Sequence, residues 1–181
     1  RASRIASGVA PTLRTVTRRI LHARAELVAE GIDSLGLEAF WHSLVAAHVR
    51  RVDGPAMSAI LHDLPQSGRQ VTDDLIDGLS ISEINVLYEY SLAYVDRSSR
   101  KSRGQFFTPD DVARFLAIRA AAFPAGTWID PCCGVGNLSY WLAHEQPEPA
   151  RFLAGQLVLV DRDPLALTLA RALLATEFAL D

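Results

Sequence analysis

The sequence predicts an α/β protein in which a helical N-terminal region precedes the opening part of a doubly wound parallel sheet. Apolar residues recur at helical spacing through residues 1–104, and strand-like alternation is missing there. Beyond a polar, basic stretch at 97–104, helical segments alternate with short apolar, strand-like ones. We therefore expect two domains, a helical one at 1–104 that ends in this basic connector and an α/β one at 105–181.

The helical region contains several segments with apolar residues three and four positions apart. Ser82 and Asn85 resemble a weakened capping box for the last of them. Breaks are expected at Gly31, at 53–55 and at 65–68, where glycine and proline interrupt the pattern. The predicted helices are 9–28, 37–49, 56–64 and 84–95.

The sequence of residues 105–181 predicts a first helix followed by a strand–helix–strand–helix unit. Thr108 is the expected N-cap of that first helix, with Pro109 in its first turn, and Asp163 is the expected cap of the last one. The second strand is continuously apolar, as in a parallel sheet covered on both faces. Such a unit implies a right-handed βαβ crossover. The predicted elements are helix 109–122, strand 127–130, helix 137–144, strand 156–161 and helix 164–180.

Composition narrows the class of protein. Hydrophobic residues make up 49% of the 181 residues and charged residues 22%, which is typical of globular proteins. No apolar run approaches the roughly 20 residues that span a bilayer, so we expect a soluble protein. The adjacent Cys132 and Cys133 favour neither a disulfide nor a zinc site and fit a reducing, cytoplasmic setting. The five histidines lack metal-binding spacing, and no G-x-S-x-G elbow indicates a hydrolase.

The most informative segment is Asp130-Pro-Cys-Cys-Gly-Val-Gly-Asn137, where a strand ends on an acid and two glycines precede a helix. An ordinary strand-to-helix turn would also explain it. A dinucleotide site would have a third glycine where Ser139 stands, and Asp130 would repel a pyrophosphate. S-adenosylmethionine has no phosphate. Asp130 can face its ammonium group, and the amide-rich turn can take its carboxylate.

A second acid ends the next strand. The Asp161 carboxylate can accept hydrogen bonds from both hydroxyls of a ribose. A solvated loop residue is the alternative for Asp161, and Asp163 is better explained as the helix cap. Two strand-end acids separated by one crossover favour a cofactor site.

These motifs carry a family resemblance. Residues 104–109 (G-Q-F-F-T-P), 130–137 (D-P-C-C-G-V-G-N) and 160–164 (V-D-R-D-P) are similar to the N6-adenine DNA methyltransferases of type I restriction-modification methylase subunits. The resemblance implies a Rossmann-like fold and methyl transfer from S-adenosylmethionine to adenine N6. It also implies double-stranded DNA as substrate, specificity and nuclease subunits as partners, no membrane, and a bacterial or archaeal cytoplasm.

The same resemblance assigns residues to the cofactor. The aromatic-Thr-Pro segment would close over it, the glycine turn would form the floor around its methionine, Asp161 would hold the ribose, and Arg162 would lie along the adenine. Val135 and Cys132 depart from the residues that are frequent at their positions. The expected cofactor-binding residues are Phe106, Phe107, Thr108, Pro109, Asp130, Cys132, Gly134, Gly136, Asn137, Asp161 and Arg162.

The catalytic signature of this family, [DNS]-P-P-[YF], is missing, because the sequence contains no Pro-Pro pair. In the family, its polar groups hold the target amino group while its aromatic residue stacks on a flipped base. We therefore expect an N-terminal fragment that is inactive alone. With only two strands, it should bind the cofactor weakly or not at all, and its exposed edges should favour self-association.

Several alternatives remain open. The basic cluster Arg97, Arg100, Lys101 and Arg103 could contact DNA phosphates or simply form a solvated connector. The first alternative is that the enzyme methylates another group: cytosine N4 in DNA, an RNA base, or a protein glutamine. The Phe-Phe-Thr-Pro segment favours DNA. A non-catalytic assembly or DNA-clamping module is the second rival.

Overall fold

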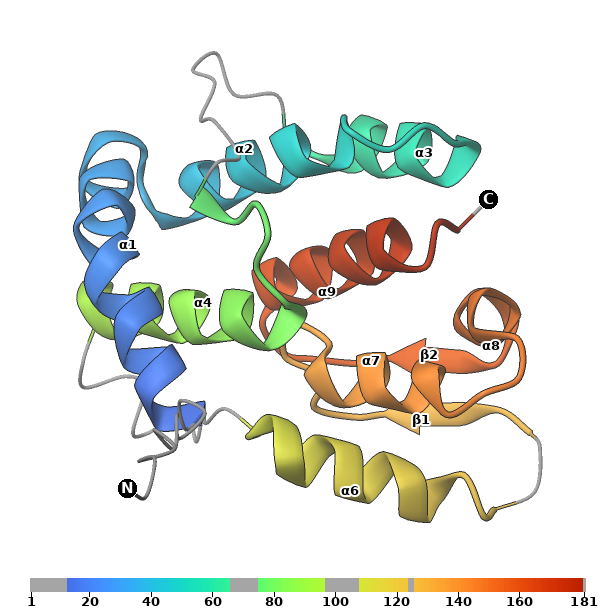
Figure 1. The fold of residues 1–181 in the computed structure, drawn as a ribbon. Coiled ribbons are helices and arrows are strands. Elements are labelled where there is room, and N and C mark those ends of the chain that lie inside the picture. The colour runs from blue at the N-terminus through green and yellow to red at the C-terminus, as the bar shows by residue number, and fades with distance from the viewer. Residues whose placement is uncertain (1–12, 66–74, 97–107, 124–125, 181) are drawn as a thin grey trace, which may run out of the picture.

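The computed structural model describes residues 13–65, 75–96, 108–123 and 126–180 (Figure 1). This part of the chain is mostly helical with a two-stranded parallel sheet. In chain order its elements are α1 (Leu13–Leu35), α2 (Leu37–Val49), α3 (Pro55–Asp63), α4 (Ile81–Val95), α6 (Asp110–Ala120), β1 (Trp128–Asp130), α7 (Asn137–His144), α8 (Pro149–Gly155), β2 (Leu157–Leu159) and α9 (Pro164–Glu177).

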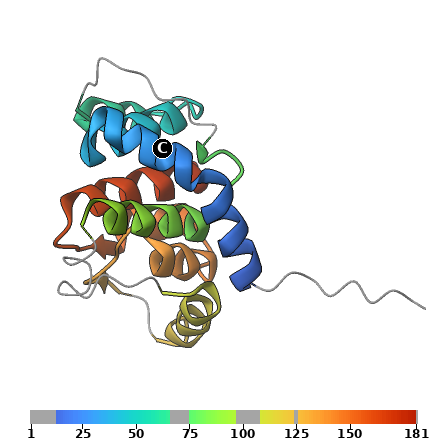
Figure 2. The ribbon, with the colours of Figure 1, turned by 90° about the vertical axis from the view of Figure 1, so that its left-hand side faces the viewer.

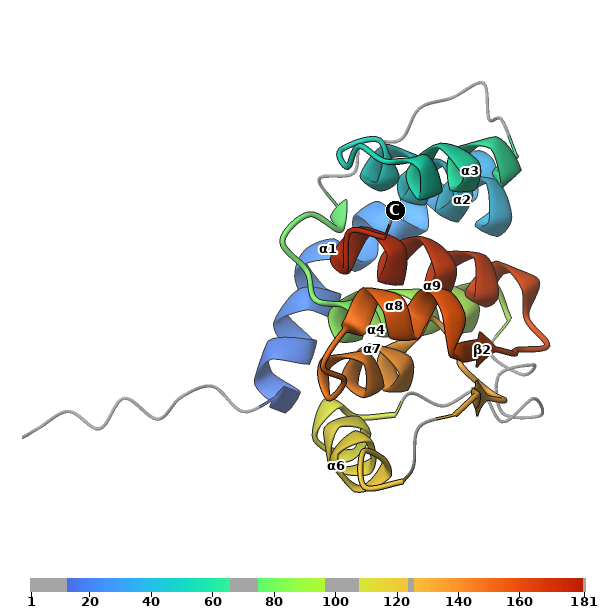
Figure 3. The same cartoon turned by 90° about the vertical axis from the view of Figure 1, so that its right-hand side faces the viewer.

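These elements are stacked in layers. Helices α2 and α3 form one outer layer, α9 and α4 lie beneath them, the sheet with α7 follows, and α6 forms the opposite outer layer (Figures 1 and 3). Helix α1 crosses the ends of these layers, packing on both α4 and α2 (Figure 2). No helix among the described residues is long and apolar enough to span a membrane.

The predicted helices of the N-terminal region are present, with corrected ends. The range predicted for α2 is confirmed, and α4 begins at Ile81. Its capping box is formed by Ser80 and Glu83, not by Ser82 and Asn85. The Ser80 N–H donates to Glu83 Oε2 at 2.9 Å, and the Glu83 N–H donates to Ser80 Oγ at 3.3 Å. Glutamate at the third position satisfies the N-cap amide, as a capping box requires.

The predicted break at Gly31 is wrong. Helix α1 continues through Gly31 to Leu35, and the chain turns at Gly36, where φ is +80°. A Cβ atom at Gly31 would overlap the ring of Phe40, which is 1% exposed. Glycine at this position therefore allows α1 and α2 to approach closely, and it does not end the helix.

The predicted parallel strand pair is confirmed, although both strands are shorter than expected. Ile129 lies opposite Val158 in the register. The connection contains α7 and also α8, a seven-residue helix that we did not predict. Burial on both faces is wrong for this sheet: Ile129 is 64% and Val158 45% exposed. Trp128 and Leu157, on the other face, pack against buried Phe152, and no described helix covers Ile129 and Val158 in this way.

The two flanking helices of the sheet begin differently. Asp163 caps α9 as predicted: its side chain accepts from the N–H groups of Leu165 at 3.1 Å and Ala166 at 3.4 Å. The predicted Thr108 cap of α6 is wrong, because Pro109 occupies the cap position and makes no side-chain cap bond. Asp110 and Asp111 in the first turn of α6 instead complement the helix dipole.

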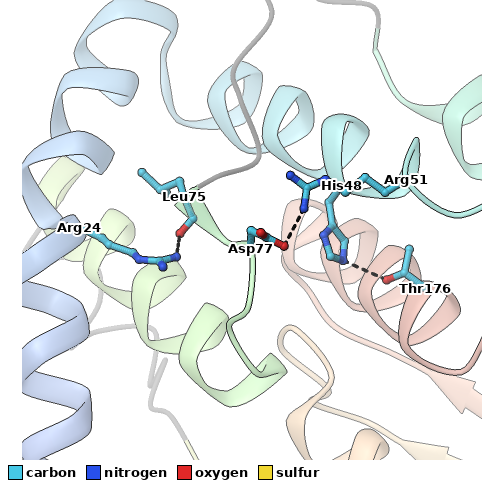
Figure 4. A network of polar contacts seen from close by, with 6 residues as sticks. All are labelled: Arg24, His48, Arg51, Leu75, Asp77 and Thr176. Atoms are coloured by element: carbon cyan, nitrogen blue, oxygen red, sulfur yellow. Dashed lines mark hydrogen bonds and ion pairs between the residues drawn. The ribbon is translucent and has the colours of Figure 1, made fainter.

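The main core runs through both parts of the chain. Buried residues of α1, α2 and α4 belong to the same cluster as those of α9. Polar contacts support this packing. Arg171 pairs with Asp63 at 2.8 Å. Thr176 Oγ1 lies 3.3 Å from His48 Nε2, as Figure 4 shows. The division into domains at 104/105 stays a prediction, but α9 packs on the N-terminal helices.

The segment that leads into α4 is held on the same assembly. Arg24 donates a hydrogen bond to the Leu75 carbonyl oxygen, and Arg51 pairs with Asp77 at 2.6 Å (Figure 4). These contacts connect the start of α4 to α1 and to the chain just after α2. The segment that precedes α4 is therefore held against α1 and against the end of α2.

Helix α6 packs on α7 through a second, smaller core cluster. Trp141 Nε1 donates to Asp110 Oδ1 at 2.9 Å, and the guanidinium of Arg114 lies 5.5 Å from the centre of the Trp141 ring. This packing brings the residues just before α6 close to the start of α7.

Candidate cofactor pocket

A pocket of about 370 Å³ lies beyond the carboxyl ends of β1 and β2. Parallel sheets commonly bind ligands at this edge, and the volume falls within the range of small-molecule sites. One wall comes from α4, and the remainder comes from the two loops after the strands, the first turns of α7 and α9, and Thr108 before α6. Its lining residues are Asn85, Tyr88, Glu89, Leu92, Thr108, Asp130, Pro131, Cys132, Cys133, Gly134, Asn137, Leu138, Asp161, Arg162, Asp163 and Ala166.

The turn after β1 depends on two left-handed glycines. Gly134 has φ +53° and Gly136 has φ +95°, a conformation that side chains with a Cβ rarely adopt. A Cβ on Gly136 would also lie 3.2 Å from Leu174 Cδ1 on α9. Gly134 thus shapes the pocket, whereas Gly136 permits the close approach of the turn to α9.

The Asp161 carboxylate connects the two loops. Its Oδ2 accepts the Gly134 N–H at 2.8 Å, and its Oδ1 accepts the Asp163 N–H at 2.9 Å. Each carboxylate oxygen can accept a second hydrogen bond. The half-buried Asp161 is therefore held in position by backbone donors while it retains the capacity to bind ligand hydroxyls.

Asp130 is 5% exposed, and this burial raises the pKa of its carboxyl group. Ser139 Oγ donates to Asp130 Oδ2 at 2.8 Å and opposes that rise in pKa. Ser139 stands where a dinucleotide site would have its third glycine, and it supports the acid instead. A cationic ligand group beside Asp130 would offset the cost of burying its charge.

Asn137, the first residue of α7, is 3% exposed. Its Nδ2 donates to the Thr108 carbonyl oxygen at 2.9 Å, which joins two segments that both line the pocket. Its Oδ1 is buried and has no hydrogen-bond partner among the residues that the structure describes. A buried acceptor without a partner is costly, so a ligand that donates a hydrogen bond to this oxygen would be favoured.

The two cysteines differ in environment. Cys132 is exposed, whereas Cys133 is buried. Burial and then the neighbouring Asp130 charge raise the pKa of the Cys133 thiol to about 12, so it stays protonated and unreactive at neutral pH. Across the described ranges, no three or more Cys, His, Asp or Glu side chains are grouped to hold a metal ion.

Sequence reasoning missed the wall contributed by α4. Asn85, Glu89 and Leu92 follow the three- and four-residue spacing of one helix face and line the pocket with Tyr88. Polar Asn85 and Glu89 on a face that turns toward the protein could have signalled this role. The distance along the chain between α4 and the glycine turn concealed it.

The structure brings together most of the predicted cofactor residues that it describes. Pro109 and Gly136 do not line the pocket. Phe106 and Phe107, and the basic cluster Arg97, Arg100, Lys101 and Arg103, lie outside the described residues. The predicted residues that line it are Thr108, Asp130, Cys132, Gly134, Asn137, Asp161 and Arg162.

The departure at Val135 has a structural explanation. Its side chain is 1% exposed and belongs to the main core. The residue between the two glycines therefore anchors the turn, and the pocket is lined by its neighbours.

The pocket lies at the ends of two parallel strands beside a glycine turn, a position at which α/β proteins commonly bind small ligands. In a comparison with known protein families, residues 80–147 match the N-6 DNA methylase family. The matched segment runs from the Ser80 cap through α4 and the glycine turn to just past the end of α7, and over this segment the chain is similar to that family. No curated protein and no solved structure is significantly similar to the chain.

Proposed function

We propose that this chain forms the cofactor-binding part of a Rossmann-like, S-adenosylmethionine-dependent DNA methyltransferase that acts on adenine N6. The observation that carries the proposal is the chemistry of the pocket. It combines two strand-end carboxylates, Asp130 and Asp161, with the buried, unpartnered Oδ1 of Asn137. All three groups accept hydrogen bonds or attract positive charge.

This chemistry fits S-adenosylmethionine better than it fits a phosphorylated cofactor. The ligand carries an ammonium, a sulfonium and two ribose hydroxyls, which are cations or hydrogen-bond donors. Arg162 is the one basic residue among the described lining residues, against acidic Glu89, Asp130, Asp161 and Asp163. A pyrophosphate in this pocket would be repelled by the carboxylates.

The side chains of the chain itself have separable roles in this proposal. Asp161 accepts hydrogen bonds from the ribose, and Asp130 faces the cationic end of the ligand. Helix α4 closes one wall and excludes water, with Leu92 as its apolar part. When bound, S-adenosylmethionine supplies the methyl group of the reaction.

None of these pocket residues is proposed to hold the target base. The [DNS]-P-P-[YF] signature that holds the flipped base in this family is absent from the 181 residues. We propose that methyl transfer takes place in a protein that combines this pocket with that signature, in a restriction-modification-like system in the cytoplasm. Double-stranded DNA is its substrate, specificity and nuclease subunits are its partners, and the basic cluster at 97–103 contacts DNA phosphates.

Ligand binding by the 181-residue chain tests the proposal. We expect weak but measurable binding, because residues from α4 and from the loops after both strands line the pocket together. S-adenosylmethionine, NAD⁺ and ATP should be titrated by calorimetry into the wild-type chain and the Asp161→Ala variant. Asp63→Asn is the control, since Asp63 is an exposed carboxylate outside the pocket.

Binding of S-adenosylmethionine in preference to the phosphorylated ligands, lost in Asp161→Ala and kept in Asp63→Asn, is the expected result. A folded chain that binds NAD⁺ or ATP, or that does not bind S-adenosylmethionine at millimolar concentration, would contradict the cofactor assignment. The helical assembly or DNA-clamping module would then be the better interpretation.

A further inference from the structure

A hydrogen bond joins the helical region to the loop that follows β2. Tyr88 of α4 is 3% exposed, and its hydroxyl donates to Asp163 Oδ2 at 2.8 Å. The two residues are 75 positions apart in the sequence. Both line the pocket, so this bond lies at the boundary between the α4 wall and the nucleoside side of the site.

The bond continues into the acid assigned to the ribose. Asp163 uses Oδ1 to cap α9, while its N–H donates to Asp161 Oδ1 at 2.9 Å. Asp161 Oδ2 accepts from the Gly134 N–H at 2.8 Å. One chain of hydrogen bonds therefore runs from Tyr88 through Asp163 and Asp161 to the glycine turn.

The Tyr88 side chain is held rigidly. Its ring packs edge-on against Trp41, with ring centres 5.4 Å apart and an interplanar angle of 76°. Trp41 is itself fully buried, and its Nε1 donates to Ser91 Oγ at 3.1 Å. Burial first, and the Asp163 charge second, raise the pKa of the Tyr88 hydroxyl, so it remains a donor at neutral pH.

We propose that Tyr88 is a positioning residue for the ribose of the cofactor. It touches no reacting atom in this proposal. By fixing Asp163, it sets the position of Asp161, and with it the geometry that receives the two hydroxyls of a ribonucleoside. This inference rests on the proposed function. It implies that the N-terminal helical region, through Tyr88 of α4, helps to position the residue that binds the ribose.

Tyr88→Phe removes the hydroxyl and keeps the ring. A hydrogen bond to a charged acceptor is strong enough that its loss should weaken binding of S-adenosylmethionine and adenosine by about tenfold. Binding of 2′-deoxyadenosine should change by less than about threefold, because it lacks one of the hydroxyls that Asp161 accepts. Ligand-observed NMR can measure the weaker affinities.

Tyr94→Phe is the matched control. Tyr94 is on the same helix, and its hydroxyl donates to Asp33 Oδ2 at 2.9 Å, away from the pocket. Loss of that bond should leave all three affinities unchanged. The ratio of adenosine to 2′-deoxyadenosine affinity is the decisive readout, because a general loss of stability would lower both equally.

A second variant protects the test against a folding defect in Tyr88→Phe. Asp163→Asn preserves the cap of α9, since asparagine caps helices about as well as aspartate. It removes the charged acceptor of Tyr88, and it should lower the same ratio. In this background, adding Tyr88→Phe should change the ratio by less than about twofold, because coupled residues are not additive.

The outcomes separate the two proposals. If the wild-type chain binds none of the ligands, the proposed function is wrong and this inference falls with it. If the wild-type chain binds them and both variants keep the wild-type ratio, the proposed function stands and only the role of Tyr88 is overturned. A lowered ratio in Tyr88→Phe, or in Asp163→Asn if Tyr88→Phe does not fold, supports the inference when Tyr94→Phe is unchanged.

Discussion

The Gly134 N–H donates a hydrogen bond to Asp161 Oδ2 at 2.8 Å, so the turn after β1 and the loop after β2 are fixed to each other. The residue expected to hold the ribose therefore also organises the turn expected to hold the methionine part. A change at Asp161 is therefore expected to affect folding as well as the proposed ligand binding, and experiments must measure both.

Asp161→Ala should lower the free energy of unfolding by about 1–3 kcal/mol, because the half-buried N–H groups of Gly134 and Asp163 lose their acceptor. Urea unfolding measures this change. Asp63→Asn is expected to change the stability little, because Asp63 is an exposed carboxylate paired with Arg171. Equal stability of Asp161→Ala and wild type would show that the two backbone bonds do not hold the loops.

Asn137→Ala should weaken S-adenosylmethionine binding by about tenfold, since the ligand loses the acceptor that the Asn137 Oδ1 provides. Stability should change by less than about 1 kcal/mol, because the lost bond to Thr108 is offset by removal of an unsatisfied buried atom. Calorimetry and thermal unfolding measure the two effects.

The control is Gln146→Ala, which removes an amide that donates to the Leu142 carbonyl oxygen away from the pocket. It should leave binding unchanged. Wild-type affinity in Asn137→Ala would mean that the unpartnered oxygen does not meet the ligand.

The buried Asp130 predicts a pH-dependent stability. Its pKa is raised in the folded protein by burial, so the unfolded chain releases this proton first, near the ordinary value of about 3.9. As the pH rises from there through the raised pKa, the wild-type protein loses stability. Asp130→Asn avoids this loss, so its Tm relative to wild type should rise from pH 3.5 to pH 7.5, while its affinity for S-adenosylmethionine falls.

Thermal unfolding across this pH range measures the effect. A Tm difference for Asp130→Asn that is constant or falls with pH would contradict the argument from burial.

Gly31→Ala should destabilise the protein by about 1–3 kcal/mol, although alanine is the better helix former, because the added methyl group overlaps the buried Phe40 ring. Gly155→Ala is the matched control. A Cβ there meets nothing within 4 Å, so alanine at the end of α8 should be neutral or slightly stabilising. Chemical denaturation compares the two variants, and a neutral Gly31→Ala would show that α1 and α2 can move apart.

Local patterns predicted the local features well. The apolar spacing of α2, the Asp163 cap of α9 and the glycine turn before α7 each depend on neighbouring residues, and each is confirmed. Other predictions were wrong where tertiary contacts decide. Gly31 looked like a break because its partner Phe40 cannot be identified from helix propensity. Helix α8 was missed because seven residues between prolines and a glycine carry little periodic signal.

The candidate site was predicted in part for the same reason. Asp130, Asn137 and Asp161 stand in local motifs at strand ends and a helix start, so the sequence indicates them directly. The α4 wall depends on a contact across 75 positions, from Tyr88 to Asp163, and no local pattern indicates such a pairing. The unpartnered oxygen of Asn137 likewise becomes visible only when its surroundings are known.

The most direct test of the central claim is a residue-resolved NMR titration of the ¹⁵N-labelled chain with S-adenosylmethionine. We expect the largest amide shifts at Gly134, Asn137, Asp161 and Asp163, with smaller ones along α4 near Tyr88 and none in α3. Shifts confined to other surfaces, or no shifts at millimolar ligand, would contradict the claim that this pocket binds S-adenosylmethionine.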